Sequence, residues 1–113
     1  MQNFIDTTGG VWLQGKLANK EVSAMSPAGN PHGGQEVTIL SLYTTMYHWG
    51  AIVAAPGYTD SSAYAAGGNP YGTSVTVGQD GKIVEDEEAI KAAVHHQAKR
   101  TVKVAEALKH LNV

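Results

Sequence analysis

The chain has 113 residues, of which 42% are hydrophobic and 16% are charged. This is the length of one domain, and the composition lies far from the low hydrophobicity and high net charge of disordered chains. The 8 basic and 10 acidic residues give a net charge of −2 and form no basic stripe, so nucleic acid is not an expected partner.

Composition also excludes several kinds of site. The chain contains no cysteine, which rules out disulfides, thiolate metal sites and cysteine nucleophiles, and fits a cytoplasmic protein. The longest apolar run, about Ala51 to Pro56, is far shorter than the roughly 20 residues that span a bilayer, so no membrane insertion is expected. Motifs for a serine nucleophile elbow, a zinc hydrolase or a phosphate-binding loop are absent, and no metal is expected.

The first part of the chain predicts a helix end, a loop and a strand. Residues 1–8 have helical spacing of apolar side chains and stop at Gly9–Gly10, which is typical of a helix end. Trp12 falls in the loop that follows. Residues 20–26 alternate between polar and apolar side chains before Pro27, which predicts a strand ending in a turn.

The middle of the chain predicts a crossover between parallel strands. Residues 27–34 have loop composition, and residues 35–49 form a helix that presents a stripe including Val37, Leu40, Tyr47 and His48. The run A-I-V-A-A at residues 51–55 is a buried strand. Strand, glycine-rich loop, helix and strand make a βαβ unit.

The last part of the chain predicts an insertion, a strand and a long helix. Residues 57–70 are small and polar and form an irregular insertion loop, and residues 73–77 alternate as a strand. Residues 86–111 form an amphipathic helix, with acidic residues at its start and basic residues at its end. Its apolar stripe comprises Ile90, Val94, Ala98, Val102, Ala105 and Leu108.

The segment Ser26–Gly34 is the strongest candidate for chemistry. It joins a strand end to a helix start, where backbone N–H groups meet ligands in open α/β sheets, although an ordinary turn is as good an interpretation. His32 lies within this loop, whereas His48 on a helix is more often structural. Trp12 beside two glycines suggests a stacking surface. His95 and His96 cannot face the same way on a helix, which argues against a metal site.

Four stretches together resemble one family. They are F-I-D-T-T-G-G-V-W at residues 4–12, H-G-G-Q-E at residues 32–36, T-T-M-Y-H-W-G at residues 44–50 and G-G-N-P-Y-G at residues 67–72. In this order and spacing they resemble the flavodoxin-like NAD(P)H:quinone oxidoreductases of the WrbA type, over nearly the whole chain.

The resemblance implies a flavodoxin-like parallel sheet with helices on both faces. It also implies FMN as cofactor, NADH or NADPH as electron donor, and a quinone that receives two electrons. By position, the family's flavin-ring loop and its flavin-contacting histidine fall on Ser26, Pro27, Ala28, Gly29, Asn30, His32, Gly33 and His48. Trp12 matches a tryptophan that walls the quinone pocket of a neighbouring subunit in the family's tetramers. No residue is assigned a catalytic role.

The chain departs from the family in two ways. The family commonly has Ser-Thr-Gly-Thr where this chain reads Pro27-Ala28-Gly29-Asn30, so two hydroxyl contacts are absent. The family's phosphate loop matches nothing in residues 1–113, which are expected to form a single C-terminal portion of the domain, with strands four and five. Such a portion is expected not to bind FMN tightly, and to form a homo-oligomer or pair with a complementary N-terminal half.

Two other functions stay open at this stage. One is a non-catalytic remnant or oligomerisation module that uses the insertion and the last helix for contact. The other is a flavodoxin that shuttles electrons to protein partners. Trp12 and the G-G-N-P-Y-G stretch favour the oxidoreductases over the shuttle, and the coding sequence upstream of Met1 would discriminate enzyme from remnant.

Overall fold

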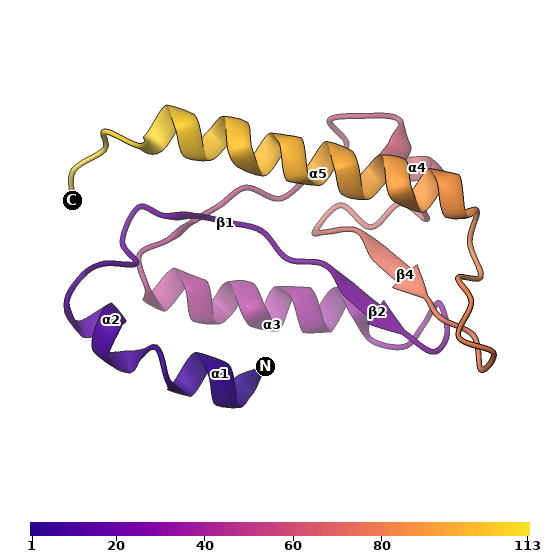
Figure 1. Cartoon of the computed structure of the whole chain (residues 1–113), viewed down its shortest axis with the longest axis horizontal. Helices are drawn as coiled ribbons and strands as arrows, with labels where there is room; N and C mark the ends of the chain where they lie inside the picture. Colours follow the sequence, from indigo (N-terminus) through magenta and orange to yellow (C-terminus); the bar gives the residue numbers. More distant parts are fainter.

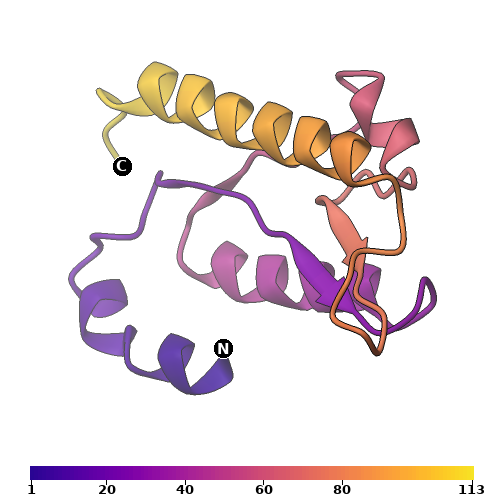
Figure 2. The same cartoon turned by 45° about the vertical axis from the view of Figure 1, so that its right-hand side comes forward.

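Short parallel strands separate the two long helices of the chain (Figure 1). In the computed structural model, which describes residues Met1–Val113, α3 packs against one side of the strands and α5 against the other, and the turned view shows the same layers (Figure 2). The elements in chain order are α1 (Gln2–Asp6), α2 (Gly9–Leu13), β1 (Glu21–Val22), β2 (Ser26–Ala28), α3 (Gln35–His48), β3 (Ile52–Val53), α4 (Ser62–Ala65), β4 (Ser74–Thr76) and α5 (Glu87–Leu108).

The strand pairing confirms the predicted crossover and the α/β class. β1 pairs in parallel with β3, where Glu21 lies opposite Ile52, and β2 pairs in parallel with β4, where Ser26 lies opposite Ser74. The chain passes from β1 through β2 and α3 to β3, the parallel partner of β1, which makes a βαβ crossover. This arrangement is consistent with part of a flavodoxin-like fold.

The strand predicted over residues 20–26 is interrupted at Ala24. The amide of Ala24 donates to Tyr43 Oη on α3 at 3.3 Å, and its carbonyl accepts from Gln97 Nε2 on α5 at 2.9 Å. Both backbone groups are therefore bonded to side chains from opposite layers instead of to a neighbouring strand. β1 lies before this residue, and β2 runs past the predicted end of the strand at Ser26, so Pro27 and Ala28 are strand residues and not the predicted loop.

Gln97 is the most completely bonded polar side chain of the core. It is 1% exposed, and its Oε1 accepts from both the amide and the hydroxyl of Thr73 at 2.8 Å. Its Nε2 also donates to Ser23 Oγ at 2.6 Å. Because a buried amide is stable only when its polar atoms have partners, Gln97 fixes α5 both to the link between β1 and β2 and to the residue before β4.

The G-G-N-P-Y-G stretch has a clear structural role. The Tyr43 hydroxyl donates to the carbonyl of Tyr71, and Asn69 accepts from the Tyr71 amide at 3.0 Å and donates to Ser74 Oγ at 2.6 Å. A Cβ added at Gly72 would lie 1.9 Å from the carbonyl oxygen of Ala24. The stretch therefore returns the chain tightly against the interrupted strand, where no side chain fits at residue 72.

The helices bury faces that differ from the predicted stripes. On α3 the buried residues are Gln35, Ile39 and Tyr43, whereas Val37 is 71% exposed and Tyr47 and His48 are also exposed. The predicted stripe on α3 is therefore wrong. The reason is that Tyr43 must reach the Ala24 peptide, and Ile39 shares its face at a spacing of four residues.

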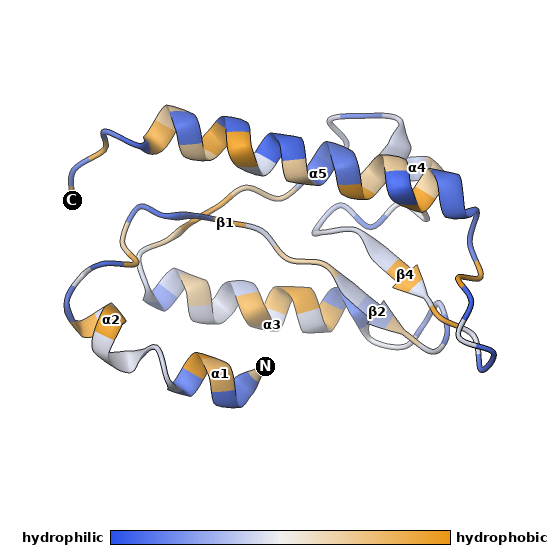
Figure 3. Cartoon of the chain, in the orientation of Figure 1, coloured by the Kyte–Doolittle hydropathy of each residue, from blue (hydrophilic) through white to orange (hydrophobic).

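The predicted apolar stripe on α5 is confirmed only near the start of the helix. Ile90 is buried as predicted, but Ala93 and Gln97 occupy the contact with the strands, and Val102 is 64% exposed. Figure 3 shows hydrophobic and hydrophilic residues alternating along the whole length of this helix. The hydrogen bonds of Gln97 set the rotation of α5, so a polar residue replaces the apolar one that the periodicity predicts.

Two predicted loops contain short helices. Gly9–Gly10 was expected to end a helix, but α1 ends at Asp6 and the glycines begin α2, which carries Trp12. Residues 57–70, expected to be irregular, contain the single turn α4. None of the helices is long and apolar enough to cross a bilayer.

Candidate functional site

The predicted ring-side loop lies between β2 and α3. Ser26 is buried at the start of β2, and its amide donates to Thr73 O at 3.2 Å. The carbonyl of Ala28 accepts from the Val77 amide at 2.8 Å, which fixes the end of the strand. Pro27 lies between them in β2, opposite Val75, so the structure accommodates its missing N–H within the strand.

Side chains fold the loop back on itself. Asn30 Oδ1 accepts from the His32 amide at 2.9 Å, and Gln35 Oε1 accepts from the Gly33 amide at 3.1 Å. Gln35 Nε2 also donates to the carbonyl of Asn30 at 2.9 Å, and Gln35 is buried. Gln35 was not among the predicted site residues, although it lies in the H-G-G-Q-E stretch, and it holds the loop in shape.

Close packing restricts the loop further. A Cβ added at Gly33 would lie 2.6 Å from the Cβ of Ala28, and Gly34 has a φ of 90°. Gly34 precedes α3 without a side-chain cap. The glycines at residues 33 and 34 are therefore required by contact and by backbone conformation respectively.

Several N–H groups of the loop have no partner within the chain. The amides of Gly29 and Asn30 donate to no backbone or side-chain acceptor, and neither do the first amides of α3, at residues 35–37. The N-terminal end of a helix carries partial positive charge, to which anions and carbonyl oxygens are attracted. The loop can therefore donate hydrogen bonds to the polar edge of a ligand.

Trp12 and His48 lie together at the other end of α3. Trp12 Nε1 donates to the carbonyl of His48 at 3.0 Å, which ties α2 to the last turn of α3. Trp12 is 48% exposed and borders a hollow of about 450 Å³, together with Thr45, His48 and Trp49. This places an indole ring and an imidazole beside one hollow.

The predicted site residues therefore fall into two groups. The loop at residues 26–33 precedes α3, whereas Trp12 and His48 lie at its far end. α3 has 14 residues, which at 1.5 Å per residue makes it about 20 Å long. Within one chain these groups are too far apart to touch the same ring system.

A small polar cavity lies beside the loop. It has a volume of about 100 Å³, and its wall includes Glu36, Asn69, Thr76 and Glu85. Glu85 accepts from the Thr76 hydroxyl at 2.6 Å and from the Thr76 amide at 2.9 and 3.1 Å. Partial burial opposes ionisation of Glu85, but these hydrogen bonds outweigh it, and the pKa of the carboxyl lies below its ordinary value of 4.5.

We expect the Glu85–Thr76 contact to stabilise the fold at neutral pH and to fail in acid. Because the pKa is lower in the folded state, the contribution is complete above the unfolded-state pKa and is lost as pH falls through the folded-state value. The measurement is the difference in urea-unfolding free energy between the wild type and Glu85→Gln, which should be largest near neutral pH and shrink below about pH 4. A difference that stays constant with pH would contradict it.

Comparison with known proteins supports the resemblance in sequence. No family model matches the chain. A Deinococcus radiodurans protein named "NAD(P)H dehydrogenase (quinone)" is 49% identical over 104 residues, which is 92% of this chain and 52% of the relative. Proteins of the same name from Aromatoleum aromaticum and Geotalea daltonii are each 36% identical, and the match covers 96% and 93% of this chain and 54% and 53% of those relatives.

The chain is a homologue of these quinone dehydrogenases. It spans about half the length of the curated relatives it matches, which is consistent with a C-terminal portion of a WrbA-like protein. The expected resemblance to the NAD(P)H:quinone oxidoreductases is thereby confirmed, and the matches cover the loop, Trp12 and His48 within nearly the whole chain.

Proposed function

We propose that the chain contributes to the FMN-dependent reduction of quinones by NADH or NADPH, supplying the loop on the ring side of the flavin and residues of the quinone pocket. The observation that carries the proposal is the set of unpartnered amides at Gly29, Asn30 and the start of α3. The names of the relatives support the choice of donor and acceptor.

The loop fits the polar edge of an isoalloxazine ring. That edge presents carbonyl oxygens, and backbone N–H groups of Gly29 and Asn30 are free to donate to them. Gly33 keeps the loop closed against Ala28, which leaves the donors in a fixed shape. Bound there, FMN would supply the chemistry of hydride transfer between a nicotinamide and a quinone.

The separation of the two groups supports an oligomer within this proposal. With about 20 Å along α3 between them, Trp12 and His48 would serve the ring held by the loop of a different copy. Trp12 would wall the quinone pocket, and His48 would contact the flavin from the neighbouring subunit. A homotetramer and a cytoplasmic setting, both implied by the resemblance, belong to the same proposal.

Exposed apolar side chains support the alternative of an assembly module. In the insertion Tyr58 and Tyr64 are 53% and 64% exposed, and on α5 Val102 is 64% exposed. Apolar surface of this kind is typical of protein interfaces. This alternative needs no flavin, so flavin binding discriminates between the two.

We expect the 113-residue chain to bind FMN weakly and to bind riboflavin equally well. The chain offers donors for the ring edge, and the resemblance places the phosphate loop outside residues 1–113. The affinity is expected at micromolar concentrations or weaker, measured by flavin fluorescence titration, with amide NMR shifts at Gly29, Asn30 and the start of α3.

A matched pair of variants tests the amide of Gly29. Gly29→Pro removes the N–H and should weaken flavin binding severalfold, whereas Gly29→Ala keeps the N–H and meets no atom within 4 Å. Circular dichroism checks that both variants fold.

Sub-micromolar binding of FMN, or a preference for FMN over riboflavin, would show that the chain itself holds the phosphate. NMR shifts confined to other segments would reject the loop as the flavin site.

A further inference from the structure

The segment between β3 and β4 closes on itself. In this insertion segment, defined as Pro56–Pro70, the amide of Gly57 donates to the carbonyl of Pro70 at 2.9 Å, so its two ends are joined. Tyr58 Oη donates to the carbonyl of Gly68 at 3.0 Å, and the rings of Tyr58 and Tyr64 stack with centroids 4.7 Å apart. The segment is therefore a compact loop held together by its own contacts.

Its apolar attachment to α5 is small. Ala66 packs against Ile90 and Ala93 on the helix. Just before the segment begins, Arg100 Nε donates to the carbonyl of Ala55 at 3.1 Å. Since the stabilisation from apolar burial scales with area, an alanine contact alone holds the segment weakly. Polar contacts with α5 must therefore contribute to its position.

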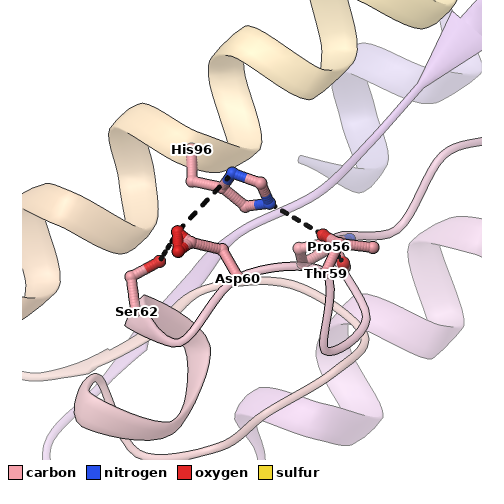
Figure 4. A network of polar contacts seen from close by, with 5 residues as sticks. All are labelled: Pro56, Thr59, Asp60, Ser62 and His96. Carbon is pink, nitrogen blue, oxygen red and sulfur yellow. Dashed lines mark hydrogen bonds and ion pairs between the residues drawn. The ribbon is translucent and has the colours of Figure 1, made fainter.

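His96 on α5 makes those polar contacts (Figure 4). Its Nε2 lies 2.7 Å from Thr59 Oγ1, and its Nδ1 lies 4.0 Å from Asp60 Oδ2. Thr59 Oγ1 also donates to the carbonyl of Pro56 at 2.6 Å, and Ser62 Oγ donates to Asp60 Oδ2 at 3.3 Å. One imidazole thus faces two consecutive residues of the insertion segment.

The hydrogen bonds of Thr59 determine which nitrogen of the His96 ring carries a hydrogen. A hydroxyl has one proton to donate, and that of Thr59 is directed to Pro56 O. His96 Nε2 must therefore carry its hydrogen and donate to Thr59. In a neutral ring, Nδ1 is then an acceptor that faces the carboxylate of Asp60, and no proton lies between them.

Protonation of the ring changes this second contact. A protonated Nδ1 donates toward Asp60, and the positive ring then faces a negative carboxylate. Asp60 is the charged group that the insertion segment presents to His96. Along α5 the nearest cations are Lys99 and Arg100, of which Arg100 is engaged with Ala55 O.

We propose that His96 is a proton-operated latch that fastens the insertion segment to α5. The neutral ring holds the segment through Thr59 alone, and the protonated ring holds it through Thr59 and Asp60. Histidine is the residue type that can gain a proton between about pH 5 and 8, so a comparison across this range tests the latch. The stacked pair of Tyr58 and Tyr64 would be held more firmly in the more acidic part of this range.

The test is hydrogen exchange of the 113-residue chain, followed by mass spectrometry at about pH 5.5 and 8 and corrected for intrinsic rates. Protection of peptides covering residues 59–66 is expected to be about threefold to fivefold greater at the lower pH, the range of an exposed ion pair. Peptides from α3 provide the internal reference and should not change. An equal protection of residues 59–66 at both pH values would overturn the proposal.

Variants separate the two contacts. Asp60→Asn should keep the basal protection and lose the pH response, and His96→Gln should lose the response and stay weakly protected at both pH values. Thr59→Val removes the hydroxyl from a side chain of the same shape and should reduce protection at both pH values, whereas Thr59→Ser should restore it. The control is His95→Gln at the neighbouring exposed histidine, which should respond as the wild type does.

A pH response that persists in Asp60→Asn or His96→Gln would contradict the latch, because the response would then come from other groups. Unchanged exchange from α3 and an unchanged circular dichroism spectrum establish that each variant is folded. If Asp60→Asn does not fold, Ser62→Ala takes its place, because it keeps the carboxylate and removes only its hydroxyl partner. This variant should retain the pH response. Loss of the response in Ser62→Ala would contradict the role assigned to Asp60.

Discussion

Gly72→Ala is expected to lower the free energy of unfolding by about 3 kcal/mol or more, at the upper end of the cost of overpacking. The new Cβ would lie 1.9 Å from the carbonyl oxygen of Ala24 and 3.1 Å from Ile39 Cδ1. The side chain of Ile39 can move slightly, but the Ala24 carbonyl is fixed by Gln97. The backbone of the G-G-N-P-Y-G stretch would therefore have to shift away from the interrupted strand.

Urea unfolding followed by circular dichroism measures this cost. Gly10→Ala is the matched control, because Gly10 lies in α2 and a Cβ there meets nothing within 4 Å. The control should leave stability unchanged or raise it by up to about 1 kcal/mol, as expected when alanine replaces a helical glycine. Equal stability of Gly72→Ala and the wild type would show that this approach is not tight in solution.

Gln97→Leu should be about as destabilising, at roughly 3 to 5 kcal/mol, because it leaves several buried polar groups without partners. The substitution removes the acceptor for the amide and hydroxyl of Thr73 and the donor to the carbonyl of Ala24. Leucine has a similar volume, so the expected loss comes from the unpaired groups and not from a cavity.

A second substitution separates the two ends of the amide. Gln97→Glu keeps oxygen acceptors for Thr73, but it loses both donated bonds and brings a carboxylate toward the Ala24 carbonyl. Its cost at neutral pH should be comparable to that of Gln97→Leu and should fall in acid, where the carboxyl is protonated and can donate. Gln79→Leu, at an exposed residue, controls for the loss of an amide. A cost for Gln97→Leu below about 1 kcal/mol would show that water replaces the missing partners.

Gly72 and Gln97 act on the same peptide group. Both contact the carbonyl of Ala24, one through close packing and the other through a hydrogen bond. Substitutions at residues that share a partner are generally not additive. The double variant should therefore lose less stability than the two single variants together, since moving Ala24 already breaks the contact that the second change removes.

The sequence predicts the layers of this fold well but not the contacts within them. Helical periodicity and the residues at the ends predicted helices over residues 35–49 and 86–111, close to the observed 35–48 and 87–108, and the parallel crossover follows from their order. The interruption at Ala24 could not be predicted, because the side chains that cause it, Tyr43 and Gln97, lie 19 and 73 residues away. The buried faces of both helices depend on those same hydrogen bonds.

The free amides of the candidate site could be predicted from the sequence, but the contacts within it could not. A glycine-rich segment between a strand and a helix predicted backbone amides available to a ligand, and the structure leaves amides free there. Its internal bonds from Asn30 and Gln35 depend on side-chain conformations that a pattern does not show. The distance between this loop and Trp12 becomes visible only once α3 is placed, because α2 meets the opposite end of that helix.

The interrupted strand also explains how the fold tolerates extra chain length. β3 and β4 each pair with their own half of that strand, and the position of β4 is set by Gly72 and Thr73 against Ala24 and Gln97. The register of β4 is therefore independent of the path that the chain takes after β3. Lengthening such a connection costs only about 0.6 kcal/mol for each doubling. A longer or shorter segment is therefore expected to leave both pairs of strands undisturbed.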